Sequence, residues 1–446
     1  MKRAGLCLGL MGLLTWSAPL AAEICTIDDV PAATLLLPYF EVDLGNLNGT
    51  KTLFSINNAS ASAAVAHVTI WTDQSIPTLD FDVYLTGYDV QTISLQDIFI
   101  RGFLPVTADD GADLANDSIS PQGSLSQDIN FPGSSGPCVA PYKNPVLDST
   151  RITNLQAAHT GRNAPAYGGC LGAAYGDNIA RGYITVDSVT QCNLLFPSSA
   201  TYFSGGIADN RNILWGDYFY VNSNQNFASG ETLVHVEACP SPSVGNGAGH
   251  CPFTPGQYTF YGRYAAVAGQ DQREPLATTF ASRYFMGGDF NGGTRLVVWR
   301  DSKTIPTGIN GPYNCNAADG PAWFPLNQSD VVAFDETENP QDLCFTGDVV
   351  SPPQGGAQTC FPLEAQRVNL VGGNVIGSNP TPSSALGWIY LNLNTTVSGV
   401  NYPASNPAIA QAWVETLMDS NGRFEVGYDA IQLDSACAPR NVVFIP

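Results

Sequence analysis

The 446-residue sequence has little lysine, glutamate or histidine, and these shortages restrict the fold classes open to it. Lysine occurs at four positions, glutamate at ten and histidine at four. Lysine and glutamate usually fill the exposed faces of helices, so their scarcity argues against a helical protein. Glycine and proline are plentiful, with 44 and 31 residues. Together with Asp, Asn, Ser and Thr they favour turns and loops.

Recognisable catalytic motifs are also missing. The sequence has no G-x-S-x-G elbow, no H-E-x-x-H pair and no phosphate-binding loop. The histidines are His67, His159, His235 and His250. His67 lies in an alternating segment and is interpreted as a half-buried structural residue. His235, Glu237 and Cys239 would share a strand face, but thiols in an exported chain usually form disulfides and not metal sites.

Positive charge is scarce, which excludes some partners. The formal net charge is −21, with 18 basic and 39 acidic residues. Such a chain is not expected to bind nucleic acid or an anionic membrane surface. Beyond the N-terminus, no stretch approaches the roughly 18 apolar residues that a spanning helix needs. The sequence therefore predicts no transmembrane anchor.

The N-terminal segment has the pattern of a secretory signal peptide. Lys2 and Arg3 precede an apolar stretch from Ala4 to Trp16, and Ala21-Ala22 offers small residues for cleavage. We expect residues 1–22 to be removed, leaving Glu23 first. The mature protein is then secreted, displayed at the cell surface or periplasmic.

The cysteines fit an oxidising compartment. Cys7 lies in the signal segment and ten cysteines follow it, an even number that predicts roughly five disulfides. Cys239 and Cys251 enclose eleven residues rich in Gly, Pro and Ser, so we expect these two to pair. No pair has the C-x2-4-C spacing that zinc sites use.

Alternating apolar residues mark β-strands. Leu79, Phe81, Val83 and Leu85 fall on one face, and segments 52–56, 66–71, 183–187, 215–221 and 424–428 show the same period. Asn48-Gly49 and Asn421-Gly422 favour tight hairpin turns. Residues 412–418 fit either a helix beginning near Pro407 or a strand. We prefer the strand, because it forms a hairpin with residues 423–428.

The second half of the chain repeats seven motifs of the first half in the same order. The pairs are Tyr39-Phe40 with Tyr284-Phe285, Asn48-Gly49-Thr50 with Gly292-Gly293-Thr294, Trp71 with Trp299, Phe81-Asp82 with Phe334-Asp335, Gln91–Leu95 with Gln366–Leu370, Gly182–Val186 with Gly387–Leu391, and Trp215 with Trp413. Such a series indicates two copies of one domain.

Together these patterns predict an all-β protein of tandem duplicated, antiparallel, immunoglobulin-like β-sandwiches with long loop insertions. The first sandwich is expected over residues 23–230, with an insertion near 104–180. A disulfide-bearing connector follows over residues 231–274, and the second sandwich occupies residues 275–446.

Three motifs of the chain resemble a group of predicted exported bacterial proteins of unknown function. They are Leu37-Pro38-Tyr39-Phe40-Glu41-Val42-Asp43, then Trp71-Thr72-Asp73, and the run from Phe81 to Asp89. The second-copy runs Gly288–Thr294 and Val298–Arg300 are similar to that group too. The resemblance implies export but no activity and no functional residues.

Acidic loops supply the best candidate metal site. Asp109, Asp110, Asp113 and Asp117 lie within nine residues, and calcium prefers several oxygens from a flexible loop. The segment lacks the EF-hand spacing, so an ordinary solvated loop is the alternative. Weaker acidic stretches occur at 335–342 and 419–425, of which the latter is more simply a hairpin turn. No other cofactor is indicated.

Two classes of function remain. The first is a non-catalytic exported protein, structural or adhesive, that presents loops or strand edges to a protein or glycan. The alternative is a carbohydrate-binding or glycoside-hydrolysing protein, which needs two suitably spaced carboxylates. Its candidate carboxylates are Glu41, Asp43, Asp82, Asp89, Asp335, Glu336 and Glu338. Tryptophans exposed beside such carboxylates (Trp71, Trp215, Trp299, Trp388, Trp413) would favour it, and buried ones would count against a hydrolase.

Overall fold

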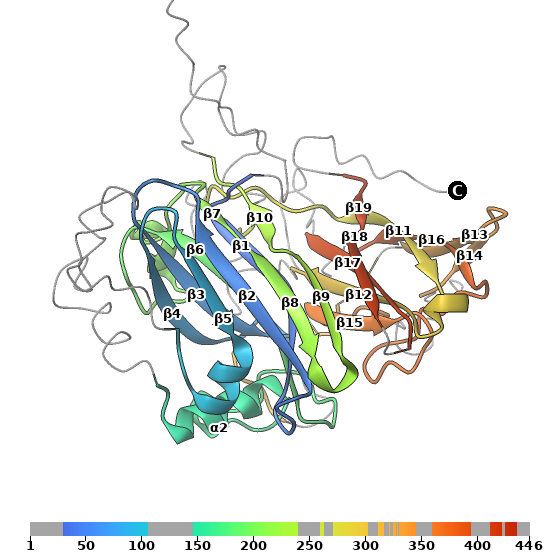
Figure 1. The fold of residues 1–446 in the computed structure, drawn as a ribbon, viewed down its shortest axis with the longest axis horizontal. Helices are drawn as coiled ribbons and strands as arrows, with labels where there is room; N and C mark the ends of the chain where they lie inside the picture. Colours follow the sequence, from blue (N-terminus) through green and yellow to red (C-terminus); the bar gives the residue numbers. More distant parts are fainter. Residues whose placement is uncertain are drawn as a thin grey trace, which may run out of the picture.

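Antiparallel β-sheets build almost the whole described part of the chain, in two sandwiches side by side (Figure 1). The computed structural model describes residues 30–105, 146–239, 259–262, 271–301, 311–315, 321, 324–326, 328, 330–344, 359–393, 411–421 and 424–434. The prediction of an all-β sandwich protein is confirmed.

The first sandwich consists of two sheets. Sheet 1a has the order β10-β1-β6-β3-β4, and sheet 1b has the order β5-β2-β8-β9 with the short β7 also paired to β2. The strands are β1 (Thr34–Asp43), β2 (Thr50–Asn58), β3 (Ala64–Thr72), β4 (Pro77–Leu85), β5 (Val90–Ser94), β6 (Ile179–Val189), β7 (Leu214–Trp215), β8 (Asp217–Asn222), β9 (Phe227–Thr232) and β10 (Val234–Val236).

The second sandwich is built in the same way. Sheet 2a has the order β14-β13-β16-β11-β19 and sheet 2b the order β15-β12-β17-β18. The strands are β11 (Thr279–Phe285), β12 (Gly293–Arg300), β13 (Asp330–Asp335), β14 (Pro340–Asp342), β15 (Ala365–Asn369), β16 (Leu386–Asn392), β17 (Ala412–Asp419), β18 (Glu425–Asp429) and β19 (Ile431–Gln432). Residues 412–418 are therefore a strand, and the predicted hairpin with β18 is confirmed.

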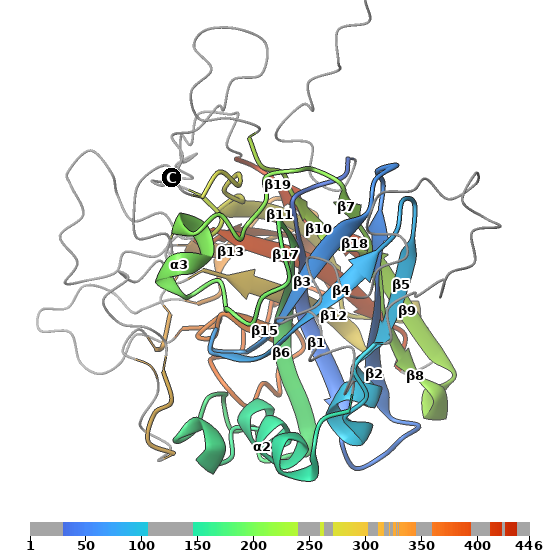
Figure 2. The same cartoon turned by 90° about the vertical axis from the view of Figure 1, so that its left-hand side faces the viewer.

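Helices are few and short. The insertion of the first half, expected to be loops, contains α2 (Ser149–His159), which begins where the Asp148 side chain accepts a hydrogen bond from the Arg151 backbone. Figure 2 shows α2 at one end of the first sandwich. The others are η1 (Asp97–Arg101), η3 (Pro165–Tyr167), α3 (Ala200–Ser204), η4 (Ser223–Gln225) and η5 (Gly288–Phe290).

The two sandwiches share one strand order. Reading sheet 2a from β19 to β14 and sheet 2b from β15 to β18, every strand has a counterpart at the same place in sheets 1a and 1b. Side-chain contacts agree. The Thr52 hydroxyl both accepts from and donates to the backbone of Glu41, at 3.1 Å in each case. Thr294 does the same with Phe285, at 2.8 Å.

The hairpin after the third strand is also the same in both sandwiches. The Thr72 hydroxyl accepts hydrogen bonds from the backbone N–H groups of the second and fourth residues after it. The Asp335 carboxylate accepts the same two hydrogen bonds in the second sandwich. The fourth residue of each turn, Ser75 or Glu338, has positive φ, at 54° and 65°. These turns therefore occupy equivalent positions.

The structural correspondence changes four of the seven motif pairs. The counterpart of Phe285 is Glu41 and that of Thr294 is Thr52, so the Tyr39-Phe40 and Asn48–Thr50 pairs shift by one and two residues. The counterpart of Trp71 in β3 is Phe334 in β13, because both precede the shared turn. Trp299 lies in β12, the counterpart of β2, so its pairing with Trp71 was wrong. The pairing of Phe81 with Phe334 was wrong for the same reason. Both errors arose because short aromatic–acidic motifs recur on several strands.

The strand order differs from the immunoglobulin arrangement named in the prediction. In immunoglobulin constant domains the first strand lies beside the second. Here β1 pairs with β6, and β2 lies between β5 and β8. Residues Val234–Val236, which the sequence analysis placed in the connector, form β10 at the edge of sheet 1a.

The sheets are stacked in four layers, in the order 1b, 1a, 2b and 2a. Val297, Trp299, Trp413 and Leu417 of sheet 2b belong to the same hydrophobic cluster as Trp71 and Tyr183 of sheet 1a. Sheet 1a is thus covered on both faces, which explains why every residue of β3 is buried. A second cluster fills the space between sheets 2b and 2a.

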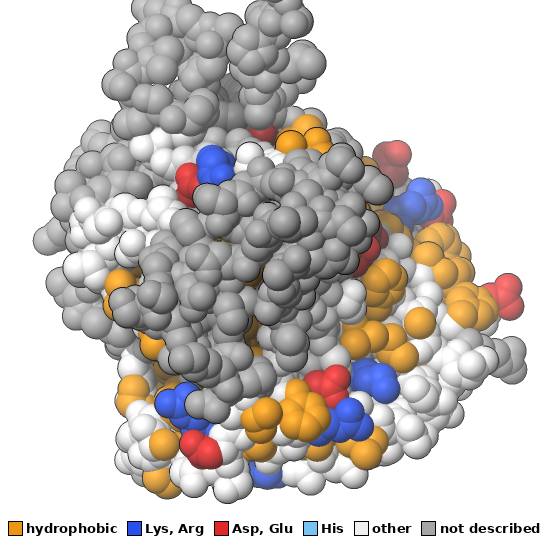
Figure 3. Space-filling model, turned by 60° about the vertical axis from the view of Figure 1, so that its left-hand side comes forward, with side chains coloured by type: hydrophobic (Ala, Val, Ile, Leu, Met, Phe, Trp, Pro, Cys, Tyr) orange, Lys and Arg blue, Asp and Glu red, His pale blue; other side chains and the backbone are white. Residues whose placement is uncertain are grey.

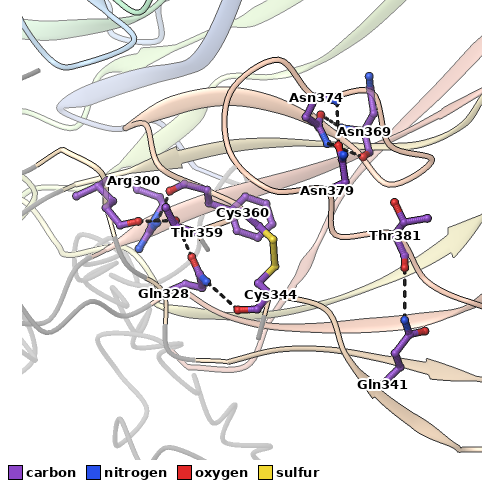
Figure 4. Close-up of a disulfide and its surroundings, with 12 residues drawn as sticks. Arg300, Gln328, Gln341, Cys344, Thr359, Cys360, Asn369, Asn374, Asn379 and Thr381 are labelled. Atoms are coloured by element: carbon purple, nitrogen blue, oxygen red, sulfur yellow. Dashed lines mark hydrogen bonds between the residues drawn. A yellow bond between two sulfur atoms is a disulfide. The ribbon is translucent and has the colours of Figure 1, made fainter. Parts of the chain in front are cut away.

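Disulfides fasten the loops. Cys344 joins Cys360 within the second half, where the Thr359 hydroxyl donates to Gln328 and the Gln328 amide donates to the Cys344 carbonyl (Figure 4). Cys170 of the first-half insertion joins Cys315, which lies in the second half of the chain. Beside that bond, the backbones of Cys170 and Tyr313 form an antiparallel bridge. The expectation of disulfides is confirmed for these four cysteines and for Cys192 and Cys239, which are also disulfide-bonded.

Candidate functional site

A polar cavity lies between the two sandwiches. Its volume is about 310 Å³, at the small end of the range of roughly 300–1,000 Å³ that ligand pockets occupy. Almost every side chain around it is polar. The first sandwich contributes Thr50, Tyr220, Asn222, Gln225 and Phe227, and the second contributes Arg295, Arg367, Asp419, Asn421 and Glu425.

Arg295 organises the second-sandwich wall. Its guanidinium lies 2.5 Å from Asp419 and 3.5 Å from Glu425. Asp419 and Glu425 are direct partners across the β17–β18 hairpin, and Arg295 projects from the neighbouring β12 on the same face. Burial raises the pKa of Glu425, while Arg367 and Arg295 oppose that rise.

Arg367 connects the cavity to the first sandwich. Its guanidinium lies 3.2 Å from Glu41, a carboxylate that is almost completely buried. Glu41 also lies 3.7 Å from Arg181 and accepts a 2.8 Å hydrogen bond from the Tyr39 hydroxyl. Each arginine of the cavity therefore faces at least one carboxylate, and the site has no large unbalanced charge.

The β8–β9 hairpin forms the opposite wall. The Asn222 side chain caps η4 by accepting from the Gln225 backbone at 3.3 Å, and it donates to Thr50 at 3.2 Å. Asn226 takes the left-handed conformation, with φ 50°, that turns the chain back into β9. The Tyr220 hydroxyl donates to the Tyr39 carbonyl at 2.8 Å. These contacts fix the wall before any ligand binds.

Asp73 joins three parts of the chain near the sandwich boundary. Its carboxylate accepts from the backbone of Ala173 in the insertion at 2.9 Å. Its carbonyl accepts from the Glu364 and Ala365 backbones of the second sandwich, at 3.1 and 3.2 Å. Burial raises the pKa of Asp73 to about 7. The contact between the insertion and the two sandwiches therefore contains a carboxyl group that stays protonated up to about neutral pH.

Replacing Asp73 by asparagine is expected to stabilise the protein at alkaline pH. Folded Asp73 titrates near 7 and the unfolded group near 3.8, so stability falls as pH rises between these values, by about 4 kcal/mol in total. Asparagine keeps the acceptor for Ala173 without this loss. Urea unfolding at pH 4 and pH 8 measures the difference. Glu336→Gln, at the exposed equivalent position, is the control, and equal pH profiles for wild type and Asp73→Asn would contradict the expectation.

A second polar cluster is closed to solvent. One row across sheet 1a holds Asp82, His67, Asp187 and Thr34 on adjacent strands. His67 lies 2.8 Å from Asp82 and is fully buried. Burial opposes protonation of His67, but the hydrogen bond and charge of Asp82 outweigh it and raise the pKa. The prediction of a half-buried His67 underestimated its burial, because Tyr202 of α3 packs against its ring.

The other histidines of the described chain have structural partners. His159 contacts the Thr78 hydroxyl and the Arg181 carbonyl, each at 2.8 Å, and burial lowers its pKa to about 4. His235 lies 2.8 Å from the Val30 carbonyl. Within the described ranges, no group of three or more His, Cys, Asp or Glu side chains is arranged to hold a metal ion.

Several predicted sites fall partly or wholly outside the described residues. Asp109, Asp110, Asp113 and Asp117 lie outside them, so the calcium site stays a prediction. Cys239 is disulfide-bonded, but Cys251 also lies outside, so their pairing stays a prediction. Among the candidate carboxylates, only Glu41 adjoins the cavity, through Arg367. Asp335 accepts hydrogen bonds within its own turn, which lower its pKa to about 2.

The cavity itself was not predicted. Sequence analysis treated Asp419 and Glu425 as parts of a hairpin turn, which is correct, but gave them no role. Arg295 and Arg367 were not singled out. The tryptophans proposed as sugar platforms do not line the cavity, since Trp71, Trp299 and Trp413 are buried in the contact between the sandwiches.

Comparisons with known proteins give the chain no relatives. No protein-family model matches it, and searches of curated proteins and of solved structures find no significant match. The part of the chain that the structure describes contains no helix long and apolar enough to cross a membrane.

Proposed function

We propose that this chain is an exported, non-catalytic binding protein that holds a neutral saccharide between two duplicated β-sandwiches. The polar cavity carries the proposal, because it places side chains from both sandwiches around one volume. The signal-like segment 1–22 and the disulfides support export. The shared strand order and shared turns support duplication, and duplicated sandwiches meeting at a cleft are a common setting for a ligand site.

The chemistry of the lining favours a polyhydroxylated, uncharged ligand. Asn222, Gln225 and Asn421 offer amides, which donate and accept hydrogen bonds, and Thr50 offers a hydroxyl. Sugar hydroxyls need both kinds of partner. Tyr220 and Phe227 supply aromatic surface for the apolar faces of a ring. The paired charges leave no surplus to attract an anion or a cation.

The same geometry favours binding over hydrolysis. A glycosidase needs one carboxyl group that donates a proton and another that stays ionised. Asp419 and Glu425 are direct cross-strand neighbours and both pair with Arg295, so a protein cation occupies both carboxylates. Trp71, Trp299 and Trp413 are buried and so cannot form the platform that a hydrolase was expected to use, and exposed Trp215 does not line the cavity.

A glycan panel tests the proposal. Wild-type protein should bind one or more neutral oligosaccharides in calorimetry, and Gln225→Ala combined with Asn421→Gly should weaken that binding about tenfold. Each lost amide contact contributes about 0.5–1.5 kcal/mol, and 1.4 kcal/mol corresponds to tenfold. Glycine tolerates the φ of 59° at position 421, so folding is preserved.

Asn163→Ala is the matched control, because it removes an exposed amide far along the chain from the cavity. Equal affinity in the double variant and in wild type would place the sugar elsewhere. Binding restricted to anionic glycans, or release of shortened products, would refute the proposed ligand class or the absence of catalysis.

A further inference from the structure

Each sandwich has two outer faces, and among the described residues one face of each pair packs on the other sandwich. In the first sandwich, the a-face is the outer face of sheet 1a together with the side of β9 next to it. In the second sandwich, it is the outer face of sheet 2a together with the side of β18 next to it. The b-face is the outer face of sheet 1b or 2b. Within the chain, the a-face of the first sandwich packs on the b-face of the second. In the part of the chain that the structure describes, the other sandwich covers neither the b-face of the first sandwich nor the a-face of the second.

The free b-face has the same contour as the covered one but is less charged. Phe219 occupies the position of Leu417, and each lies over a glycine, Gly230 or Gly427. Trp215 corresponds to buried Trp413 and is 42% exposed, and Phe219 is 44% exposed. At the positions of Arg295, Arg367, Asp419 and Glu425, the register places Leu53, Thr92, Val221 and Ala228.

The free a-face is also more apolar than the covered a-face at corresponding positions. The position of buried Glu41, which faces Arg367, is taken by Phe285. Phe424 corresponds to Phe227, and Val426 corresponds to Ser229. Phe424 and Val426 are 45% and 46% exposed. Phe290 packs near both Phe285 and Phe424, so these side chains form one apolar area.

The two changes are complementary. Where the covered contact sets Glu41 against Arg367, the two free faces set Phe285 against Thr92. Uncharged groups replace the charges on both sides at this matching position, which suits a contact between these two faces. Figure 3 shows hydrophobic side chains exposed among polar ones on the side of the molecule where sheet 1b lies. Exposed apolar groups gathered in this way mark interaction surfaces.

We propose that copies of this chain assemble head to tail, with the free a-face of one molecule packed on the free b-face of the next. The contact between molecules then repeats the contact between the sandwiches of one molecule. Because the two faces differ, such an interface is heterologous and propagates into an open linear chain unless the rotation closes a ring. This inference does not depend on the saccharide site.

Two variants that block opposite faces test the assembly. Phe219→Asp places a charge on the b-face, and Val426→Asp places one on the a-face. Both residues are substantially exposed, so the variants should keep the melting temperature of wild type. Val375→Asp, at an exposed residue in the loop after β15, is the control. Sedimentation velocity from about 1 μM to 1 mM covers the range of moderate affinities.

Wild type and Val375→Asp should form oligomers that grow with concentration, whereas each blocked variant alone should remain a monomer. An equimolar mixture of the two blocked variants should give a dimer and nothing larger, because one intact face of each kind remains. A wild type that stays monomeric at 1 mM would refute the proposal. Oligomers that persist in both blocked variants would show that other surfaces are used.

Discussion

Gly182→Ala and Gly387→Ala are each expected to destabilise the protein by at least about 3 kcal/mol. A Cβ atom at residue 182 would lie 2.0 Å from the Trp71 carbonyl oxygen, and one at residue 387 would lie 1.9 Å from that of Phe334. Both obstacles are backbone atoms of the neighbouring strand, which cannot move aside without separating the sheet. Overpacking of this kind is among the mechanisms that produce large losses.

Urea unfolding with intact disulfides measures the effect. Gly287→Ala is the control, because its φ of −177° is ordinary extended backbone and no atom lies within 4 Å of its added Cβ. That variant should stay within about 0.5 kcal/mol of wild type. Losses below 1 kcal/mol in both buried variants would show that the strands are spaced more widely at these equivalent positions.

Arg273→Met is expected to cost about 3–5 kcal/mol, because it leaves buried carboxylates without their counter-charge. The fully buried Arg273 guanidinium lies 3.6 Å from Asp187 and 3.5 Å from Asp271, and it donates to the Asp209 carbonyl at 3.1 Å. Asp187 also accepts hydrogen bonds from Thr34, Tyr202 and Tyr261. The arginine thus fastens the chain before β11 to sheet 1a.

A second substitution separates charge from packing. Asp187→Asn in the Arg273→Met background should recover part of the lost stability, since the amide oxygen still accepts hydrogen bonds but needs no counter-charge. Arg211→Met is the control, as Arg211 is 45% exposed and pairs with Asp209 at the surface. Exposed pairs contribute about 0–1 kcal/mol. Equal losses in the Arg273 and Arg211 variants would refute the role given to the buried cluster.

The strands were the most predictable part of this molecule. The alternation of apolar and polar residues in β4 is a local pattern, and so is the turn at Asn421. The sequence alone therefore indicates both. Helix α2 was missed because its sequence, Ser149 to His159, contains few apolar residues with helical spacing. Its best local signal was Asp148, a suitable N-cap.

The stacking of layers and the cavity could not be predicted in this way. The β3 strand was expected to bury one face, and only the packing of sheet 2b on sheet 1a explains why both are buried. Arg295 and Asn222 lie on different sandwiches, and each looks like an ordinary surface residue of its own strand. Their shared site arises from the relative placement of two halves, which no local pattern encodes.

The bond between Cys170 and Cys315 makes the chain a covalent ring. The two cysteines are 145 residues apart in sequence, so the ring encloses all strands from β6 to β12 and the connector between the two halves. Closing a loop of this length lowers the entropy of the unfolded chain, which corresponds to about 5 kcal/mol in the simple loop model. A protease that cuts once between the halves would open the ring without releasing either half. The link between the two sandwiches therefore does not depend on any single peptide bond of the connector, which would protect a protein exported as proposed above.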